Sequence, residues 1–317
     1  MGIVQRALNS FILQSCSEVG AGTARCMPGL PCAYLRREGM RMRLVAFGGD
    51  ARMLGALDAA KRADWETAYV CREEDAPQAG TWADAVMLPW PRSFEDGRLA
   101  GTQLPRERVL ELLPACGVAL HGSGVTAQEL LRAKRTMDPA HDEALLRVNA
   151  QLTAEGAIQR AMQRPGRALL GSTCVVTGFG RIGQALVRRL TAMDAFVIVC
   201  ARNEAQMRRA HELGAHPLPL ERIAQACAQA DVIFNTVPAR ILHEAALARI
   251  GGETLLIELA SQPYGADPET AKRLNVCMVL AGGLPGKYAP MDAGAALFET
   301  LQRKAMEQDG EGGHGDG

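Results

Sequence analysis

The sequence predicts an α/β protein with two doubly wound parallel-sheet domains, of the flavodoxin and Rossmann kinds, and an active site in the cleft between them. Three observations support this fold class. Short apolar runs alternate with helix-like segments from residue 42 onward, a pattern typical of parallel strands covered on both faces. The runs form two series, separated by the helix breaker at residues 165–166. A glycine-rich fingerprint opens the second series at residue 178.

The first series begins with an apolar run at residues 44–47, which we expect to be a buried strand. The run ends in Gly48, Gly49 and Asp50, and a helix-like stretch follows as far as Arg62. A connecting helix is expected from about residue 153 to residue 163. Further strands of this series are expected at residues 67–70, 85–88, 118–120 and 145–148.

The second series repeats the alternation of short apolar runs and helical segments, which gives a second domain of the same class. Its strands are expected at residues 174–176, 195–200, 232–235, 255–258 and 276–280. The chain then divides into an irregular N-terminal extension (1–41), an N-terminal substrate-side domain (42–150), a Rossmann domain with its connecting helix (151–288), and a C-terminal helix with a frayed tail (289–317). Because Met40 and Met42 directly precede the first strand, residues 1–41 are compatible with an over-extended start.

Composition excludes several classes of protein. The 317 residues hold 35 basic and 35 acidic side chains, and this balance disfavours a nucleic-acid or membrane-surface partner. No apolar stretch is long enough to cross a bilayer, and no secretory signal is expected at the N-terminus. The nine cysteines contain no C-x-x-C pair, which indicates free core thiols in a reducing cytoplasm and no metal site. A soluble protein that binds small molecules remains.

The most specific motif is a dinucleotide fingerprint in the setting that it needs. It follows an expected strand and opens an amphipathic helix. The first glycine permits a tight turn, the second lets the backbone approach a pyrophosphate, and the third allows close packing of helix and strand. The six residues expected to bind the cofactor are Gly178, Phe179, Gly180, Arg181, Ile182 and Gly183.

The tip of the next strand favours NADP over NAD. An NAD site places Asp or Glu there to bind the ribose hydroxyls, whereas this tip carries Arg202, a cation suited to a 2′-phosphate. Arg208 and Arg209 are close enough in sequence to add to it. NAD stays open as the alternative because Glu204 lies nearby.

The loops that follow the later strands carry the candidate catalytic groups, because ligands bind beyond the carboxyl ends of the strands in open α/β sheets. These loops hold Asn235 and Pro238, then Ser261, and then Lys287. No Arg stands at residues 258–261, and no His lies between His243 and the C-terminal tail. The chemistry of 2-hydroxyacid dehydrogenases is therefore not expected.

Several motifs in one order resemble the family formed by the A-type subunit of dipicolinate synthase. The resemblance covers about residues 42–301, and its first and last motifs distinguish this family from other dehydrogenases. Two departures from the family pattern are Glu258 in place of Asp and Asp292 in place of Thr, and Pro91 with Arg92 interrupts a loop that is usually rich in Ser. The motifs lie at residues 48–52, 153–156, 178–183, 235–239, 259–261 and 283–290.

The resemblance implies an NADP-dependent oxidoreductase that forms dipicolinate from 4-hydroxy-tetrahydrodipicolinate during endospore formation. It also implies that the partner is the flavoprotein-like B-type subunit of dipicolinate synthase, and that the protein lies in the cytoplasm of the mother cell. A planar dicarboxylate substrate requires cations and hydrogen-bond donors. The candidate cations are Arg52 and Lys287, with Asp50 orienting Arg52, and the candidate donors are Ser123 and Ser261. Asn235 and Pro238 are expected to shape the nicotinamide pocket.

Two other functions stay open at this stage. The oligomeric state also stays open, and a homo-oligomer is possible. One of the two functions is another NADP-dependent dehydrogenase with the layout of shikimate dehydrogenase, which would require a Lys–Asp pair in the first domain. Lys61 and Lys134 are the only lysines there, and neither has a convincing Asp partner in a glycine-rich loop. The other is a protein that binds the nucleotide without catalysing a reaction. Each candidate side chain also has an ordinary structural role open to it, such as helix capping by Asp50.

Overall fold

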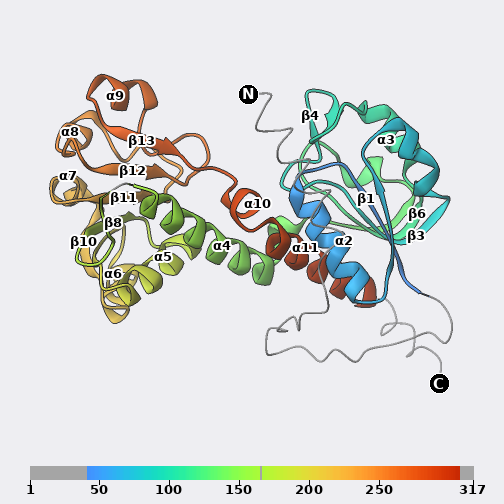
Figure 1. Ribbon diagram of the computed structural model, residues 1–317, viewed down its shortest axis with the longest axis horizontal. Coiled ribbons are helices and arrows are strands. Elements are labelled where there is room, and N and C mark those ends of the chain that lie inside the picture. Colours follow the sequence, from blue (N-terminus) through green and yellow to red (C-terminus); the bar gives the residue numbers. More distant parts are fainter. Residues whose placement is uncertain (1–40, 165, 308–317) are drawn as a thin grey trace. The chain divides into compact units, whose positions relative to one another are not determined.

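The computed structural model describes residues 41–164 and 166–307, and these form two parallel sheets with helices on both faces. In Figure 1 the first sheet runs in blue to green and the second in yellow-green to orange. The expected α/β class with two doubly wound parallel sheets is confirmed. The predicted boundary at residue 150 falls inside one long helix, α4 (Glu143–Met162). The predicted N-terminal extension lies outside the described residues, apart from Arg41.

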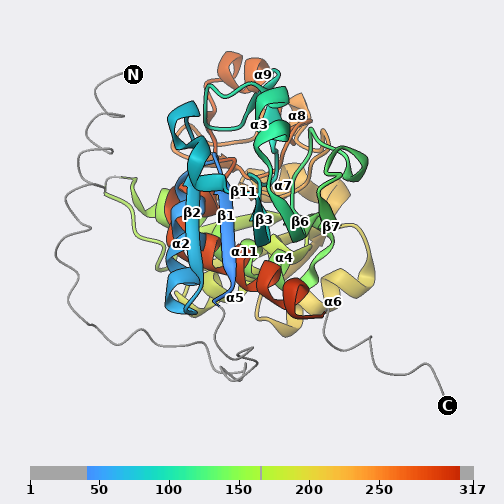
Figure 2. The ribbon, with the colours of Figure 1, turned by 90° about the vertical axis from the view of Figure 1, so that its right-hand side faces the viewer.

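The first sheet has five parallel strands in the order β2-β1-β3-β6-β7, which is the flavodoxin order (Figure 2). Side chains alternate between its faces, so Leu44 and Ala46 pack under α2 (Ala51–Arg62), whereas Val45 and Phe47 face α3 (Arg106–Leu112). A small hairpin of β4 (Phe94–Glu95) and β5 (Arg98–Leu99) adds to this part of the chain. The strands are β1 (Arg43–Phe47), β2 (Glu66–Val70), β3 (Trp82–Met87), β6 (Ala115–Leu120) and β7 (Ala133–Met137).

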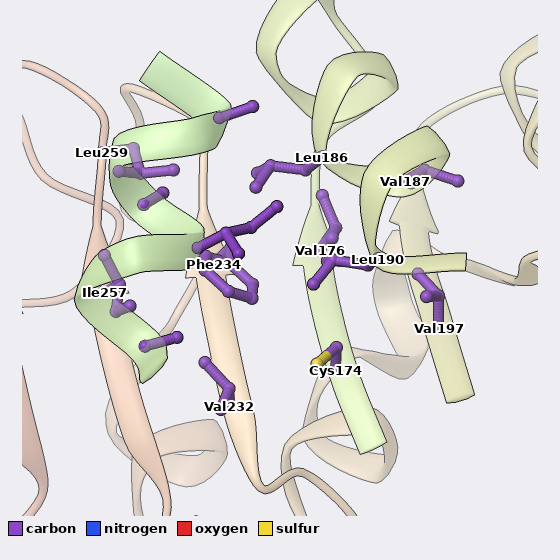
Figure 3. Close-up of a cluster of buried hydrophobic side chains, with 14 of the residues drawn as sticks. Cys174, Val176, Leu186, Val187, Leu190, Val197, Val232, Phe234, Ile257 and Leu259 are labelled. Carbon is purple, nitrogen blue, oxygen red and sulfur yellow. The ribbon is translucent and has the colours of Figure 1, made fainter. Parts of the chain in front are cut away.

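The second sheet has six parallel strands in the Rossmann order, β10-β9-β8-β11-β12-β13. One face packs under α4 and α5 (Arg181–Ala192), and Figure 3 shows Val176, Phe234 and Ile257 in this core with Leu186 and Leu190 of α5. The other face packs under three short helices, α7 (Ile223–Cys227), α8 (Glu244–Leu247) and α9 (Pro268–Arg273). The strands are β8 (Thr173–Thr177), β9 (Phe196–Ala201), β10 (His216–Pro219), β11 (Val232–Asn235), β12 (Leu255–Glu258) and β13 (Cys277–Leu280).

The strand expected at residues 145–148 is wrong, because these residues form the first turns of α4. Asp142 caps that helix by accepting a hydrogen bond from the backbone N–H of Leu145 at 2.8 Å. Only Leu145 of the four residues is fully buried, which fits one face of a helix and not a buried strand. The strands missing from the two predicted sheets are β7 and β10, and their polar or proline-containing runs are compatible with edge positions because one side of an edge strand faces solvent.

The last helix, α11 (Pro290–Met306), packs on α2 and so joins the core of the first sheet. The two helices approach so closely that no side chain fits between them at two positions. A Cβ atom at Gly294 would lie 2.0 Å from the backbone oxygen of Arg52, and one at Gly55 would lie 2.6 Å from that of Met291. The predicted C-terminal helix therefore exists, and it belongs structurally with the first sheet.

The structure describes six of the cysteines, and all six are free thiols. Four are buried, as expected for core residues, namely Cys116, Cys174, Cys200 and Cys227. The expectation that Cys277 is a core residue is wrong, because it opens β13 at the edge of its sheet and is exposed. In the described part of the chain, no helix combines the length and apolar character needed to span a membrane.

Candidate dinucleotide site and its neighbouring loops

The glycine fingerprint forms the turn between β8 and α5, and its three glycines have different steric surroundings. Gly178 has a φ of 84°, in the region that L side chains rarely adopt. A Cβ at Gly183 would lie 2.4 Å from the backbone oxygen of Gly178, so this position must lack a side chain for α5 to pack against β8. A Cβ at Gly180 would meet nothing within 4 Å, which leaves open space beside the helix N-terminus. This turn therefore fits a dinucleotide pyrophosphate.

The helix that receives the pyrophosphate begins at Arg181, whose guanidinium pairs with the carboxylate of Glu143 at the start of α4. Arg181 Nη2 donates to Glu143 Oε2 at 2.6 Å, and its Nε donates to Oε1 at 3.1 Å. This hydrogen bonding lowers the pKa of Glu143 to about 2. Arg181 is therefore held at the N-terminal end of α5 by a residue of the connecting helix. Of the other fingerprint residues, Phe179 is buried and Ile182 is half-buried.

The tip of β9 presents an exposed cation. Arg202 directly follows this strand and forms no ion pair with any residue that the structure describes. Next to it, Asn203 caps α6 (Glu204–Glu212) by accepting a hydrogen bond from the backbone N–H of Gln206. Arg209, in contrast, pairs with Glu212 of the same helix. Arg202 is thus available to an anionic ligand at the strand end where the adenosine ribose of a dinucleotide is recognised.

Three buried polar side chains lie side by side at the carboxyl ends of β8, β11 and β12. They are Thr177, Asn235 and Glu258, and each is at most 1% exposed. The strand register places Asn235 opposite both of the others. The Thr177 hydroxyl donates to the Asn235 side-chain oxygen, and the Asn235 amide donates to the Glu258 carboxylate. Burial raises the pKa of Glu258, while the hydrogen bonds that it accepts act in the opposite direction.

Two loops continue from this network, and they carry Pro238, which is expected at the nicotinamide pocket, and Ser261, which is expected to donate a hydrogen bond to the substrate. Pro238 is exposed on the loop after β11, and Ser261 is exposed on the loop after β12. A hollow of about 530 Å³ lies beside the second loop, lined by Arg240, Gln262, Pro263, Tyr264 and Pro268. Pro238 and Ser261 therefore stand on loops that begin at the same buried network.

The candidate cation of the first sheet, Arg52, is bound to its expected partner. Asp50 caps α2 by accepting from the Arg52 backbone N–H at 3.0 Å, and it also accepts from Arg52 Nε and Nη2 at 2.9 and 2.8 Å. The Arg52 side chain is 15% exposed and that of Asp50 is 49% exposed. Asp50 therefore has both of the roles that the sequence leaves open, capping the helix and orienting Arg52.

The last family motif lies against this pair. Gly286, in α10 (Leu284–Tyr288), is so close that a Cβ there would lie 2.9 Å from Asp50 Oδ2 and 3.0 Å from Arg52 Nε. Its neighbour Lys287 is exposed, and its Nζ donates to the backbone oxygen of Gly282 at 2.8 Å. The structure thus brings the Asp50–Arg52 pair next to the segment that carries Lys287.

Ser123 stands on a different loop, after β6. Its hydroxyl donates to the backbone oxygen of Pro91 at 3.3 Å, and its backbone N–H donates to the same oxygen at 2.8 Å. The side chain is exposed, so its hydroxyl can turn toward a ligand. No hydrogen bond within the described residues joins Ser123 to Arg52 or to Ser261.

Sequence reasoning missed the network of Thr177, Asn235 and Glu258 as a unit. Each of these polar residues closes a buried apolar strand, and that shared position was the available signal. It also missed the pairing of Arg181 with Glu143, for which the sequence holds no signal because the two lie on different helices. Glu155 of the family motif pairs with Arg189 at 2.7 Å, which is the structural role that its helix position allows.

Comparison with known proteins supports a dinucleotide-binding domain in the second part of the chain. Residues 140–262 match the family model described as D-isomer specific 2-hydroxyacid dehydrogenase, NAD binding domain. The chain is 28% identical over 295 residues to the A-type subunit of dipicolinate synthase from Bacillus subtilis (strain 168), a match that spans 86% of this chain and 98% of the relative. These matches support a dehydrogenase with a nicotinamide dinucleotide cofactor.

Solved structures agree with the sequence match. The corresponding dipicolinate synthase structure from Bacillus subtilis superposes with a TM-score of 0.72 at 27% identity, over 86% of this chain and 98% of that one. Its counterpart from Bacillus halodurans gives a TM-score of 0.71 at 28% identity, over 83% and 97%. D-lactate dehydrogenase of Salmonella shares the fold, with a TM-score of 0.54 at 17% identity over 86% and 98%. The resemblance to the A-type subunit of dipicolinate synthase that the motifs indicate is confirmed.

Proposed function

From this resemblance, we propose that the protein is an NADP-dependent oxidoreductase that forms dipicolinate from 4-hydroxy-tetrahydrodipicolinate. The conversion requires loss of water from the ring and removal of one hydride and one proton. A bound NADP⁺ would supply the hydride acceptor. The protein's own contribution is then to bind a dicarboxylate, orient its ring and exclude competing reactions.

The observation that carries this proposal is the contact of Gly286 with Asp50 and Arg52. The two motifs that distinguish the dipicolinate synthase family from other dehydrogenases lie at opposite ends of the sequence. They nevertheless meet here, since a Cβ at Gly286 would lie 3.0 Å from Arg52 Nε. A contact between family-specific segments is what a shared substrate site requires, whereas the fingerprint alone serves many dehydrogenases.

In the proposed site, Arg52 and Lys287 bind the two carboxylates of the substrate. Asp50 fixes the guanidinium plane of Arg52 through two hydrogen bonds and leaves its Nη1 free to donate to a carboxylate oxygen. Lys287 supplies a second, more mobile cation, since its only hydrogen bond among the described residues is to the Gly282 oxygen. Ser123 and Ser261 donate hydrogen bonds from exposed loops.

The fingerprint residues hold the pyrophosphate at the start of α5, and Arg202 binds a 2′-phosphate, which is the reason to propose NADP. Its guanidinium is exposed, it stands at the strand end that recognises the adenosine ribose, and no described acidic side chain neutralises it. Asn235 and Pro238 shape the pocket at the nicotinamide end.

The test is turnover of freshly generated 4-hydroxy-tetrahydrodipicolinate, followed by NADPH absorbance and by terbium luminescence of dipicolinate. The full chain is assayed alone and with the B-type partner of dipicolinate synthase, because the relatives are named as one subunit of that enzyme. We expect product in at least one of these conditions. NADPH binding without product in either condition would contradict the proposal and favour a protein that only binds nucleotide.

A matched pair of variants on one helix tests the proposed substrate site. Arg52→Ala is expected to lower kcat/KM by roughly 10- to 100-fold, because a charge-assisted hydrogen bond to the substrate is lost. Arg62→Ala removes an arginine in the last turn of the same helix, where it pairs with Asp58. This control should retain the activity of the wild type. Equal activities of the two variants would show that Arg52 does not bind the substrate.

The proposal also includes a partner protein and a cellular location. We propose that the chain works with the flavoprotein-like B-type subunit of dipicolinate synthase, in the cytoplasm of the mother cell of a spore-forming bacterium. The support is the match to a relative that is named as one subunit of a larger enzyme. Copurification of a tagged chain from sporulating cells tests this association. A tagged chain that brings down no flavoprotein-like partner from such cells would contradict it.

A further inference from the structure

The Rossmann strand order assigns the two halves of a dinucleotide to two halves of the sheet. The adenosine half lies beyond β8, β9 and β10, because the residue that recognises its ribose follows the strand next to the fingerprint strand. The nicotinamide half then lies beyond β11, β12 and β13. Glu258 closes the middle one of these three strands and is 1% exposed.

The Glu258 carboxylate gathers donors from two loops that border the nicotinamide half. On one side it accepts from the Asn235 amide. On the other, its Oε2 accepts from the backbone N–H of Gly265 at 3.0 Å and of Ala266 at 3.4 Å, and its Oε1 accepts from Ala260 at 3.2 Å. Both ends of the loop that carries Ser261 are thus bound to one side chain.

The same network also fixes the backbone conformation at the start of the loop after β11. The second amide hydrogen of Asn235 is donated to the Val237 backbone oxygen at 3.1 Å, and its side-chain oxygen accepts from the Val237 N–H at 3.3 Å. The Thr177 hydroxyl fixes which way round the Asn235 amide lies, because it donates to that oxygen. The second loop also packs directly on this amide, since a Cβ at Gly265 would lie 2.3 Å from Asn235 Nδ2.

We propose that Glu258 is a positioning residue that holds the loops at residues 236–239 and 259–266 in the arrangement that binds the nicotinamide half of the cofactor. The inference deepens the proposed function, since it rests on the dinucleotide site of that proposal. Glu258 itself is buried and acts indirectly. It acts through the Asn235 amide and through the backbone that leads into Ser261.

The structure suggests a variant that perturbs this role without changing side-chain size. In Glu258→Gln, one acceptor oxygen becomes an NH₂ group that faces the N–H donors of Asn235 or of the loop. Two donors cannot bond to each other, so one loop must move. Thr177→Val is a milder second variant, because it removes only the hydroxyl that orients Asn235.

The experiment compares binding of the whole cofactor with binding of its adenosine half. Dissociation constants are measured by calorimetry for NADPH and 2′-phospho-ADP-ribose, or for NADH and ADP-ribose if the wild type prefers that pair. We expect Glu258→Gln to weaken binding of the whole cofactor by about tenfold while the adenosine half binds within about twofold of wild type. Thr177→Val should give the same split with a smaller factor.

A matched control separates positioning from general loss of stability. Thr254→Val removes another buried hydroxyl, which donates to the Ala230 backbone oxygen at the opposite end of β12. It should lower the melting temperature without a split between the two ligands. A variant Glu258→Gln that weakens both ligands equally, or neither, would overturn the inference. Because no turnover is measured, a failure of dipicolinate formation leaves this result standing, whereas a wild type that binds neither cofactor would overturn both.

Discussion

The crossing of α2 and α11 offers a direct test of how tightly the C-terminal helix is packed on the first sheet. In the variant Gly294→Ala, the new methyl group would lie 2.0 Å from the Arg52 backbone oxygen and 2.6 Å from the Ala56 backbone nitrogen. Carbon contacts are favourable only near about 3.5 Å and beyond. Both neighbours are backbone atoms of a helix, so they cannot turn aside, and α11 must move outward by about 1.5 Å.

This displacement reaches buried side chains. The face of α11 that packs on α2 and the first sheet includes Ala296, Leu297, Phe298 and Leu301, all of them buried. Overpacking of such a contact costs about 3 kcal/mol. Replacing glycine by alanine inside a helix returns about 1 kcal/mol. The net loss of unfolding free energy is therefore about 2 kcal/mol, which corresponds to a fall in melting temperature of roughly 4–8 °C for a protein of this size.

The assay is thermal unfolding followed by circular dichroism, supported by urea denaturation. The control is Gly252→Ala, because a Cβ at that exposed position would meet nothing within 4 Å. We expect the control to melt within about 1 °C of wild type. If Gly294→Ala melted as high as Gly252→Ala, the close crossing of the two helices would be refuted.

Three further predictions concern the site. Arg202→Ala should weaken NADPH binding by roughly 10-fold to 100-fold and leave NADH binding within about twofold, as measured by calorimetry. Gly286→Ala should displace the Arg52 guanidinium, since its Cβ would lie 3.0 Å from Nε. Because the Arg52 side chain can rotate away from the new methyl group, the melting temperature should change little, whereas kcat/KM should fall. Glu143→Gln should lower the free energy of unfolding at pH 7, because it removes the ion pair with Arg181. The folded pKa of Glu143 lies at about 2, below its usual 4.5, so this stabilisation is present above pH 4.5 and is lost as pH falls toward 2.

Each of these predictions has a result that contradicts it. If Arg202→Ala weakened the binding of NADPH and of NADH equally, Arg202 would have no role in binding a 2′-phosphate. A wild-type kcat/KM in Gly286→Ala would show that the Arg52 position does not matter for turnover. A difference between wild type and Glu143→Gln that stayed constant in urea titrations from about pH 7 to about pH 3 would contradict the low pKa of this carboxylate.

Local patterns predicted five of the six strands in the Rossmann half of the fold. Apolar runs such as residues 232–235 are strands because both faces of a parallel sheet are covered, and this requirement leaves a continuous apolar signature. The fingerprint is also largely local, since Gly178 needs a positive φ for the turn and a Cβ at Gly183 would clash with the backbone oxygen of Gly178 within the same motif. The exposed Arg202 could be predicted for the same reason, as it directly follows a recognisable strand.

The same reasoning failed where a local pattern has two interpretations. Residues 145–148 form a short apolar run that fits a strand as well as a helix, and periodicity over four residues cannot separate the two. The decision came from the Asp142 cap and from the length of α4, which continues for 20 residues. Cys277 was misassigned because the apolar run of β13 resembles that of a central strand, whereas the sheet order places this strand at an edge.

The sequence by itself thus determined the fold class, the dinucleotide turn and the identity of the candidate side chains, because each depends on neighbours within one strand, turn or helix. Tertiary structure alone decided which of these side chains meet. The contact of Gly286 with Asp50 and Arg52 depends on the return of α10 and α11 to the first sheet. The network around Glu258 depends on the register of three parallel strands. The physical reason is that strand order and helix crossings join residues far apart in the chain, and no local pattern records that pairing.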